Sequence, residues 1–423
     1  MGMTITQKIL AAHCSRTQIC QGEYIQPKVD MLFGNELGTA LAIKGREALL
    51  KNGVFDPTRV AVIPDHFTPN KDIQAAEQCK VVRSFAREQG LKHYYEVGRM
   101  GIEHVLMHEK GLVSAGELVV GADSHTCTHG ALGAFAIGVG STDFFYTLMT
   151  GEVWLTVPES IRVALNGIPA RWVTGKDIIL ALIGQLGAGG ANYKVLEFCG
   201  DGLSHLPMDA RFTLCNMAIE AGAKSAIIPP DAITKLYLER RALRPSSFLQ
   251  SDPDAVYCRE VIIELPQLVP QIACPHSPDN TRPLKEVAQG MIDVDQVFVG
   301  GCTNGRLDDL RLAAELLKGR QVHQRVRMIV VPGSQEVYLR AMDEGLLRIF
   351  IEAGAVVNTP SCGACIGGHS GLLASGEVCV STTNRNFRGR MGHMDSRVYL
   401  TGVPAAVAAA ITGRIATPEE VFL

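Results

Sequence analysis

Three cysteines lie in loops whose composition could hold a metal. Cys362 and Cys365 are separated by two residues in the segment PSCGACIGGH, and Cys302 lies about 60 residues earlier, in GGCTNGR. Glycines beside all three would let the backbone approach a bulky inorganic group. Structural zinc prefers four ligands, and a thioredoxin-like pair needs no distant third cysteine. The spacing therefore favours three thiolates on an iron–sulfur cluster, with zinc and ordinary buried thiols as the alternatives.

A second segment, GADSHTCTHG, could transfer protons. Its Asp123 and His125 could form a carboxylate–imidazole pair, in which the carboxylate selects the tautomer of the ring and raises its basicity. Two other interpretations stay open. Asp123 or Ser124 could simply cap a helix, or His125 and His129, four residues apart, could bind zinc from one helical face.

Two further segments could bind an acidic substrate. In NRNFRGR, the guanidinium groups of Arg385 and Arg390 suit planar carboxylates, with Asn384 beside them. A solvated basic turn is the alternative. In CNMAIEAGA, Asn216 and Glu220 are four residues apart on a predicted helix and can face the same way, although such a pair can equally belong to a helix surface.

Short apolar segments alternate with longer segments of helical period, which predicts α/β layers with largely parallel sheets. The segment 71–90 is predicted to be a helix, and its final glycine, Gly90, suits a helix C-terminus. The strand-like segments are RVAVI (59–63), ELVV (117–120), QVFV (296–299), MIVV (328–331), AVV (355–357) and EVCV (377–380).

The unusual residues follow these predicted strands. RVAVI leads into Asp65 and His66, which repeat the pairing of an aspartate with a histidine, and other strands lead into the cysteine and arginine segments. In open α/β sheets, ligands bind at the carboxyl ends of parallel strands. We therefore expect one composite site, built by at least two of three segments: 1–157 with the acid–base loops, 158–283, and 284–423 with the cysteines and arginines.

Composition excludes several classes of protein. The 40 Lys and Arg residues nearly balance the 43 Asp and Glu residues, and no run of like charges could follow a phosphate backbone. No apolar stretch approaches the roughly 18 residues that span a bilayer, and no secretory signal is evident, so we expect a cytosolic protein. The 12 cysteines are too scattered for a disulfide scaffold. Neither a dinucleotide fingerprint nor a P-loop is complete.

Four motifs in order, GADSHTCTHG, VGGCTNGR, SCGACIGG and NRNFRGR, closely resemble the aconitase superfamily. The resemblance covers essentially the whole chain. MTITQKILAAH, PHSPDN and GVPAAVAAAITG are also similar to the 3-isopropylmalate dehydratase large subunits within that superfamily. The resemblance implies three α/β/α domains around a cleft, with one 4Fe-4S cluster on Cys302, Cys362 and Cys365. One iron without a protein ligand would act as a Lewis acid on the substrate.

The resemblance also implies an activity, the dehydration and rehydration of a 2-substituted malate, such as 3-isopropylmalate in leucine biosynthesis. His66, oriented by Asp65, would protonate the leaving hydroxyl. The residues implied to manage the bound water are His104, Asp123, His125 and Glu220. Those implied to orient cluster and substrate are Ser124, Asn216, Asn384, Arg385 and Arg390.

The chain departs from the family pattern in two places. Asn35 and Glu36 stand where a Gln or His often precedes an acidic residue in a substrate-contact loop. The swivelling domain of single-chain aconitases, with its serine base and further arginines, has no counterpart here. We therefore expect a small subunit as partner. Homoaconitate or dimethylmalate are alternative substrates, and a zinc metallohydrolase or an RNA-binding regulator are alternatives from other classes.

Overall fold

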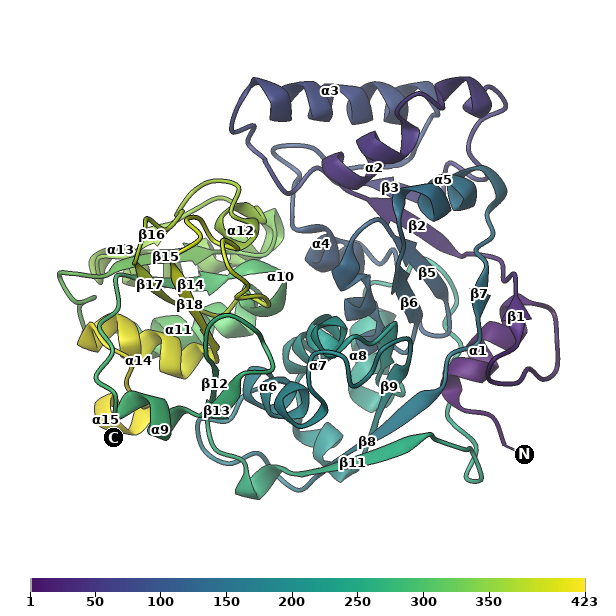
Figure 1. Ribbon diagram of the computed structural model, residues 1–423. Helices are drawn as coiled ribbons and strands as arrows, with labels where there is room; N and C mark the ends of the chain where they lie inside the picture. Colours follow the sequence, from purple (N-terminus) through teal and green to yellow (C-terminus); the bar gives the residue numbers. More distant parts are fainter. Residues whose placement is uncertain (1, 423) are drawn as a thin grey trace. The chain divides into compact units, whose positions relative to one another are not determined.

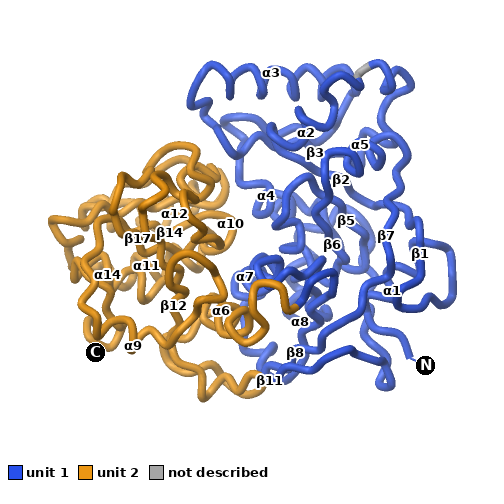
Figure 2. Tube along the Cα trace, viewed as in Figure 1, with its two compact units in different colours: residues 1–165, 191–262 blue, residues 166–190, 263–423 orange. Residues whose placement is uncertain are grey.

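The computed structural model describes residues 2–422, which divide into two units (Figure 2). The first unit contains residues 1–165 and 191–262, and the second contains residues 166–190 and 263–423. The division into segments 1–157, 158–283 and 284–423 remains a prediction.

A five-stranded parallel sheet forms the centre of the first unit. Its strands lie in the order β4-β3-β2-β5-β6, and each pairing is parallel. Strands β2 (Met31–Gly34), β3 (Val60–Val62) and β5 (Leu118–Gly121) are buried along their whole length, as expected for a sheet covered on both faces. Because β2 lies between β3 and β5, the loops after these three strands leave the same edge of the sheet.

Helices α2, α3 and α5 pack together over this sheet (Figure 1). A second sheet in the order β10-β9-β8-β11 and a two-stranded β1–β7 ribbon complete the strands of this unit. Its helices, with short 3₁₀ helices labelled η, are α1 (Ile5–His13), α2 (Glu36–Ile43), η1 (Glu47–Leu50), α3 (Ile73–Glu88), α4 (Glu103–Glu109), η2 (Ser124–Leu132), α5 (Ser141–Thr150), η3 (Asp201–His205), α7 (Met208–Asn216), η4 (Met217–Ala221) and α8 (Ala232–Glu239). Its remaining strands are β1 (Tyr24–Ile25), β4 (His93–Tyr94), β6 (Phe135–Gly138), β7 (Leu155–Thr156), β8 (Ser160–Asn166), β9 (Val195–Cys199), β10 (Ser225–Ile227) and β11 (Arg259–Glu264).

The second unit is built on a seven-stranded sheet in the order β13-β12-β18-β17-β14-β15-β16. The run from β18 to β16 is parallel, and β12 and β13 extend it as an antiparallel edge. Its strands are β12 (Gln271–Ala273), β13 (Thr281–Pro283), β14 (Gln296–Gly300), β15 (Arg327–Val331), β16 (Val356–Val357), β17 (Val378–Ser381) and β18 (Arg397–Thr401). Its helices are α6 (Gly175–Leu186), η5 (Leu265–Gln267), α9 (Leu284–Ala288), α10 (Gly301–Asn304), α11 (Leu307–Leu317), α12 (Gln335–Asp343), α13 (Leu346–Glu352), η6 (Gly363–Ile366), α14 (Val403–Thr412) and α15 (Pro418–Val421).

The predicted elements are confirmed. Each of the six strand-like segments overlaps a strand, from β3 (Val60–Val62) at 59–63 to β17 (Val378–Ser381) at 377–380. The predicted helix is α3, and Gly90 beyond its end takes a φ of 62°, a left-handed conformation that glycine adopts without strain. The predicted α/β class with largely parallel sheets is therefore correct.

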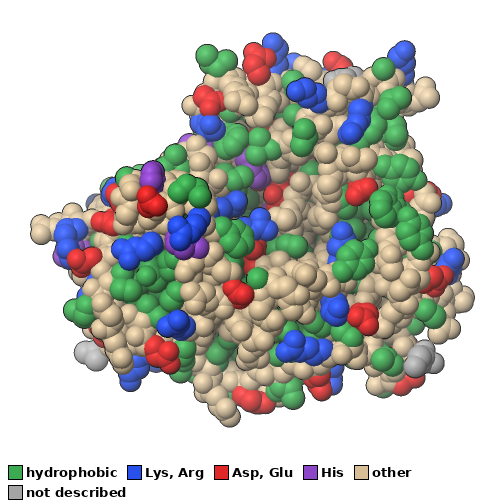
Figure 3. Space-filling model, viewed as in Figure 1, with side chains coloured by type: hydrophobic (Ala, Val, Ile, Leu, Met, Phe, Trp, Pro, Cys, Tyr) green, Lys and Arg blue, Asp and Glu red, His purple; other side chains and the backbone are tan. Residues whose placement is uncertain are grey.

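The distribution of surface charge bears on nucleic-acid binding, and the character of the helices bears on membrane spans. On the face drawn in Figure 3, basic and acidic side chains are interspersed. Among residues 2–422, none of the helices has both the length and the apolar character required to cross a membrane.

Candidate active-site residues

Asp65 and His66 form a buried pair directly after strand β3. His66 Nδ1 lies 2.5 Å from Asp65 Oδ1, and His66 Nε2 lies 3.9 Å from Asp123 Oδ2. Burial alone would lower the pKa of His66, but the Asp65 carboxylate, with the charges of Glu36 and Asp123, raises that pKa to about 10. His66 is therefore a charged imidazolium at neutral pH, which makes it an acid rather than a base.

Asp123 joins two further histidines. Its Oδ1 accepts a hydrogen bond from the His125 amide and lies 2.8 Å from His104 Nε2. His125 Nε2 lies 2.8 Å from Glu220 Oε1. Burial acts to raise the pKa of Asp123, but the hydrogen bonds from His104 and His125 hold it well below its ordinary value. Asp123 therefore caps η2, as one interpretation expected, and also contacts the imidazole of His104.

The helix predicted to carry Asn216 and Glu220 is not continuous. Helix α7 ends at Asn216, and the tighter 3₁₀ helix η4 begins at Met217. Both side chains contact residues of η2. Asn216 Nδ2 donates to Thr128 Oγ1 at 2.9 Å, and Glu220 contacts His125. The two side chains thus brace the acid–base loop instead of sharing one helical face.

The alternative of a zinc pair formed by His125 and His129 is not supported by the local geometry. Segment 124–132 is a 3₁₀ helix, so residues four apart do not lie on one face. Ligand atoms of His125 lie within 4.8 Å of those of His104 and Asp123. The His129 ring instead packs against Phe33, with ring centroids 5.3 Å apart.

Asn35 and Glu36, at the start of α2, contact both neighbouring loops. Glu36 Oε1 accepts from the Phe67 amide at 2.7 Å, and Oε2 accepts from the Asp65 amide at 3.0 Å. Asn35 Nδ2 donates to Glu103 Oε1 at 2.8 Å, while Asn35 Oδ1 caps α2. The family pattern placed Asn35 and Glu36 in a substrate-contact loop, but neither that pattern nor the residue types predicted these contacts or singled out Glu103. Glu36 begins α2 and Glu103 begins α4, and only the tertiary structure shows that both contact the loop that carries His66.

Cys302 begins α10, directly after β14. The turn from β14 into α10 requires glycine at position 300, because Gly300 has a φ of 146° and a Cβ there would lie 2.3 Å from the Val331 carbonyl oxygen. Arg306 then fixes the turn, donating to the carbonyl oxygens of Cys302 at 2.7 Å and Thr303 at 2.6 Å.

Cys362 and Cys365 share one turn, closed by a 3.0 Å hydrogen bond from the Cys365 amide to the Cys362 carbonyl. The Asn384 side chain joins this turn to Cys302. Its Nδ2 lies 3.3 Å from Cys302 Sγ, and its Oδ1 lies 3.6 Å from Cys365 Sγ. Two of the three cysteines are buried and Cys362 is half-buried. Three loops of one sheet thus bring the predicted cysteines and Asn384 to one place in the second unit.

The donor set in this place fits an iron–sulfur group. Thiolates are the ligands that such clusters use, and an amide N–H directed at a cysteine sulfur is a hydrogen bond that tunes them. Lys176 on α6 adds a basic group: it is fully buried and donates to the carbonyl oxygens of Thr382 and Thr383 at 2.7 and 2.8 Å. Desolvation lowers the pKa of Lys176 to about 7, although the charges of Cys302 and Cys365 act to raise it. Lys176 was missed because a single lysine carries no distinctive signal in the sequence.

The residues predicted to bind substrate lie in both units. Arg390 Nη2 lies 4.0 Å from Cys365 Sγ, and both Arg385 and Arg390 are half-buried. Ser124 is half-buried at the start of η2 in the first unit. Their role as a clamp for substrate, and the assembly of one composite site, remain predictions.

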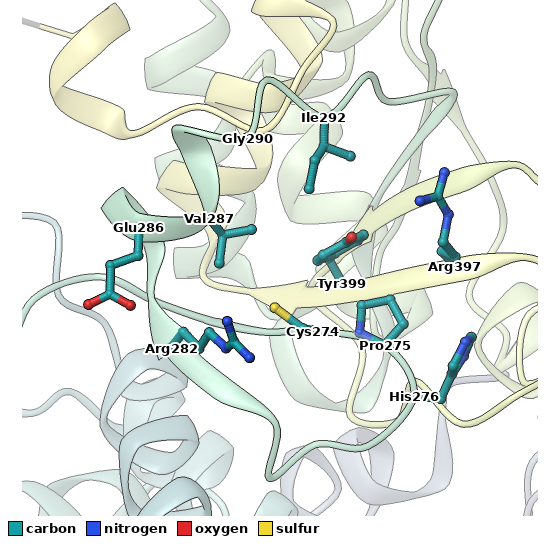
Figure 4. Close-up of a pocket in the computed structure, with 10 residues that line it drawn as sticks. All are labelled: Cys274, Pro275, His276, Arg282, Glu286, Val287, Gly290, Ile292, Arg397 and Tyr399. Carbon is teal, nitrogen blue, oxygen red and sulfur yellow. The ribbon is translucent and has the colours of Figure 1, made fainter.

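A cavity of about 490 Å³ in the second unit contains none of the predicted residues (Figure 4). It is lined by residues of the segment after β12, of β13, of the α9 region and of β18. Arg282 and Glu286 lie at one side of the view and His276 at the other, so the polar groups do not converge on one point. We assign no site to it.

Comparison with protein families identifies one match. The Aconitase family (aconitate hydratase) matches residues 57–413. In fold, the chain is similar to the crystal structure of Thermococcus kodakaraensis aconitase X in its holo-form, with a TM-score of 0.52, 13% identity and 93% of each chain covered.

Curated relatives are similar over the whole length. The chain is 56% identical over 421 residues to a protein of Moorella thermoacetica named 3-isopropylmalate dehydratase large subunit, with 100% of each chain covered. It is 55% identical over 420 residues to 3-isopropylmalate dehydratase large subunit 1 of Pyrococcus furiosus, with 99% of each chain covered.

Proposed function

Because the chain belongs to the aconitase family, we propose that it is the large subunit of a 3-isopropylmalate dehydratase. In this function it interconverts 2-isopropylmalate and 3-isopropylmalate in leucine biosynthesis, working in the cytosol. The observation that carries the proposal is identity of more than half of the residues, over the full chain, to relatives with this name.

The reaction exchanges a hydroxyl and a hydrogen between adjacent carbons. In the first half, a C–O bond and the neighbouring C–H bond break, a C=C bond forms, the hydroxyl leaves as water with an added proton, and the C–H proton goes to a base. In the second half, water adds back in the opposite sense. The reaction therefore needs a proton donor for the hydroxyl, a base for the C–H bond, and groups that hold the carboxylates.

His66 is the proton donor in this proposal. Its Nδ1 is bonded to Asp65, so the transferable proton is on Nε2, the atom that faces Asp123. A pKa of about 10 keeps that proton in place at neutral pH. Asp123, His104, His125 and Glu220 form the connected network that positions the water released and taken up.

Cys302, Cys362 and Cys365 would hold the 4Fe-4S cluster. When bound, that cluster supplies a Lewis acid that makes hydroxide a better leaving group. Asn384 orients two of the thiolates, and Arg385 and Arg390 are the proposed forks for the substrate carboxylates. Asn216 and Ser124 support the substrate from the first unit. The base is proposed to come from a small subunit.

The test is an anaerobic assay of the purified chain, combined with the small protein encoded beside it. We expect turnover of 3-isopropylmalate at a higher kcat/KM than for homocitrate, citrate or 2,3-dimethylmalate. Preference for one of the other acids would identify a different dehydratase of the family. Absence of turnover with all four acids would contradict the proposed activity.

The cluster ligands are tested separately. Cys302→Ser, Cys362→Ser and Cys365→Ser should each abolish the visible absorbance of the cluster and the activity, because a ligand atom of the group is lost. Cys379→Ser is the matched control, since Cys379 is a buried thiol of strand β17 outside the proposed set. Full iron content in any of the three variants would remove that residue from the ligand set.

A further inference from the structure

The start of α2 lies between the two acid–base loops of the first unit. Strand β2 leads directly into Asn35 and Glu36, and it is the central strand between β3, which leads to His66, and β5, which leads to Asp123. The Glu36 side chain is fully buried and turns toward the β3 loop.

The carboxylate of Glu36 contacts the backbone on both sides of His66. One oxygen accepts from the amide of the preceding residue, Asp65, and the other from the amide of the following residue, Phe67. Charge-assisted hydrogen bonds of this kind are stronger than neutral ones. Two of them, on the 64–65 and 66–67 peptide groups, fix the backbone before and after the residue from which the His66 side chain leaves.

Neighbouring groups extend this arrangement. Asp65 Oδ2 accepts from the Glu103 amide at 2.7 Å, and the Glu103 carboxyl is held by Asn35. The charged groups that face His66 are Asp65, Glu36 and Asp123, and Glu103 lies within electrostatic range. Asn35, which caps α2, and Glu36, its first residue, therefore connect to the loop after β3 and to α4.

A metal site is the competing interpretation of this cluster. Ligand atoms of Glu36, Asp65 and His66 do lie within 4.8 Å of one another. However, both oxygens of Glu36 accept backbone amides, and Asp65 is bonded to His66 and to the Glu103 amide. A metal would have to replace these protein donors, so hydrogen bonding explains the cluster better.

We propose that Glu36 is a positioning residue for the proton donor: it holds the amides of Asp65 and Phe67, directs the imidazole of His66, and places a carboxylate beside it. The inference rests on the proposed function, in which His66 is the acid. Glu36 itself touches no reacting atom.

The test compares Glu36→Gln with the wild type in the cluster-loaded complex with the small subunit. A glutamine keeps one acceptor oxygen but loses the second and the charge. We expect kcat to fall by about tenfold or more, while KM stays within about twofold of the wild-type value. The alkaline limb of kcat/KM should move to lower pH by about one unit, which is the lower end of the pKa shift that one nearby charge causes. Glu88→Gln, an exposed carboxylate on α3, should change neither.

A purely structural role would give a different result. In that case Glu36→Gln would lower the melting temperature but leave the alkaline limb where it is, and the proposal would be overturned. If Glu36→Gln does not fold, Glu36→Asp replaces it: the charge remains but the shorter side chain cannot reach both amides. We then expect an unchanged limb with a lower kcat, and a wild-type kcat would overturn the proposal.

Titration of the His66 ring separates this inference from the proposed function. The ring is followed by NMR in the cluster-loaded chain with ¹³C-labelled histidine, and His66→Asn assigns its signal. A lower His66 pKa in Glu36→Gln supports the inference even when no substrate turns over, whereas an unchanged His66 pKa contradicts it. Failure of the wild type to act on 3-isopropylmalate concerns the proposed function alone.

Discussion

At the scale of single residues, the tautomer of His66 decides what it can do. Asp65 binds Nδ1 at 2.5 Å, so only Nε2 can exchange a proton with a substrate. The same buried carboxylate keeps the ring charged against the desolvation that would otherwise neutralise it. The pair is thus suited to donating a proton, and less suited to removing one.

Replacing the donor should impair turnover more than binding. We expect His66→Asn to lower kcat by about 100-fold to 10,000-fold, the usual contribution of a general acid, while the cluster absorbance stays unchanged. KM should change much less. Steady-state kinetics and an iron assay on the same preparation check this, and loss of iron from the variant would show that His66 has a structural role instead.

The raised pKa of His66 also predicts how stability depends on pH. Its pKa rises from an ordinary 6.5 to about 10 on folding, so the folded state binds the proton more tightly than the unfolded state. This contribution is fully present below about pH 6.5 and is lost as pH rises from there through about 10. The difference in unfolding free energy between the wild type and His66→Asn should therefore shrink over that range. Denaturant titrations at pH 7, 8.5 and 10 measure it, and a constant difference would contradict the assignment.

Only some of these residues could be found from the sequence. Paired motifs gave a signal, because Asp65 with His66, Asp123 with His125, and the three cysteines stand close together or follow predicted strands. Glu103 and Lys176 gave none, and Glu36 was noted only through its place in the family pattern. Each is a single charged residue in a helix, where most such residues face solvent, and only tertiary packing shows that these three are buried.

At the scale of elements, the failure to predict strand β2 had the largest effect on the predicted site. Six other strands were predicted, since each is a β-rich apolar run before a distinctive loop. MLFG has four residues and was not recognised as a strand, so the sheet order that places α2 beside His66 could not be derived. The break between α7 and η4 was also unpredicted, because periodicity does not distinguish an α-helix from a 3₁₀ turn at its end.

Helix α6 should influence the cluster through Lys176. Burial lowers the pKa of Lys176 to about 7, and below that pH its positive charge, near Cys302 and Cys365, favours the addition of an electron. We expect Lys176→Met to lower the reduction potential of the cluster, where a shift of about 59 mV equals a tenfold change in a one-electron equilibrium. Redox titration followed by electron paramagnetic resonance measures it. Lys224→Met, at a half-buried lysine of the first unit, is the control, and equal potentials in both variants would contradict the prediction.

At the scale of the whole molecule, the chemistry is divided between two units. The proton donor and its network belong to the first, and the cysteines, Asn384 and the arginines belong to the second. The proposed reaction further needs a base, which we assign to a small subunit. Activity should therefore depend on assembly.

The purified chain should take up its cluster yet show almost no isomerisation until a small subunit of roughly one domain's size is added. The cluster of the chain alone should also be more sensitive to oxygen. Adding the small subunit anaerobically should restore turnover along a saturable curve that reports the affinity of the two subunits. Strong turnover by the 423-residue chain, with a single band on a gel, would contradict the two-subunit assignment.

The strong hold of Asp65 on His66 has a physiological consequence. An isolated histidine would be only roughly one-tenth protonated at pH 7.5, and its supply of protons would vary with every change in the acidity of the cell. A donor with a pKa of about 10 remains loaded throughout that range. In the proposed reaction, the proton supply from His66 should therefore stay nearly constant across the pH range of the cell.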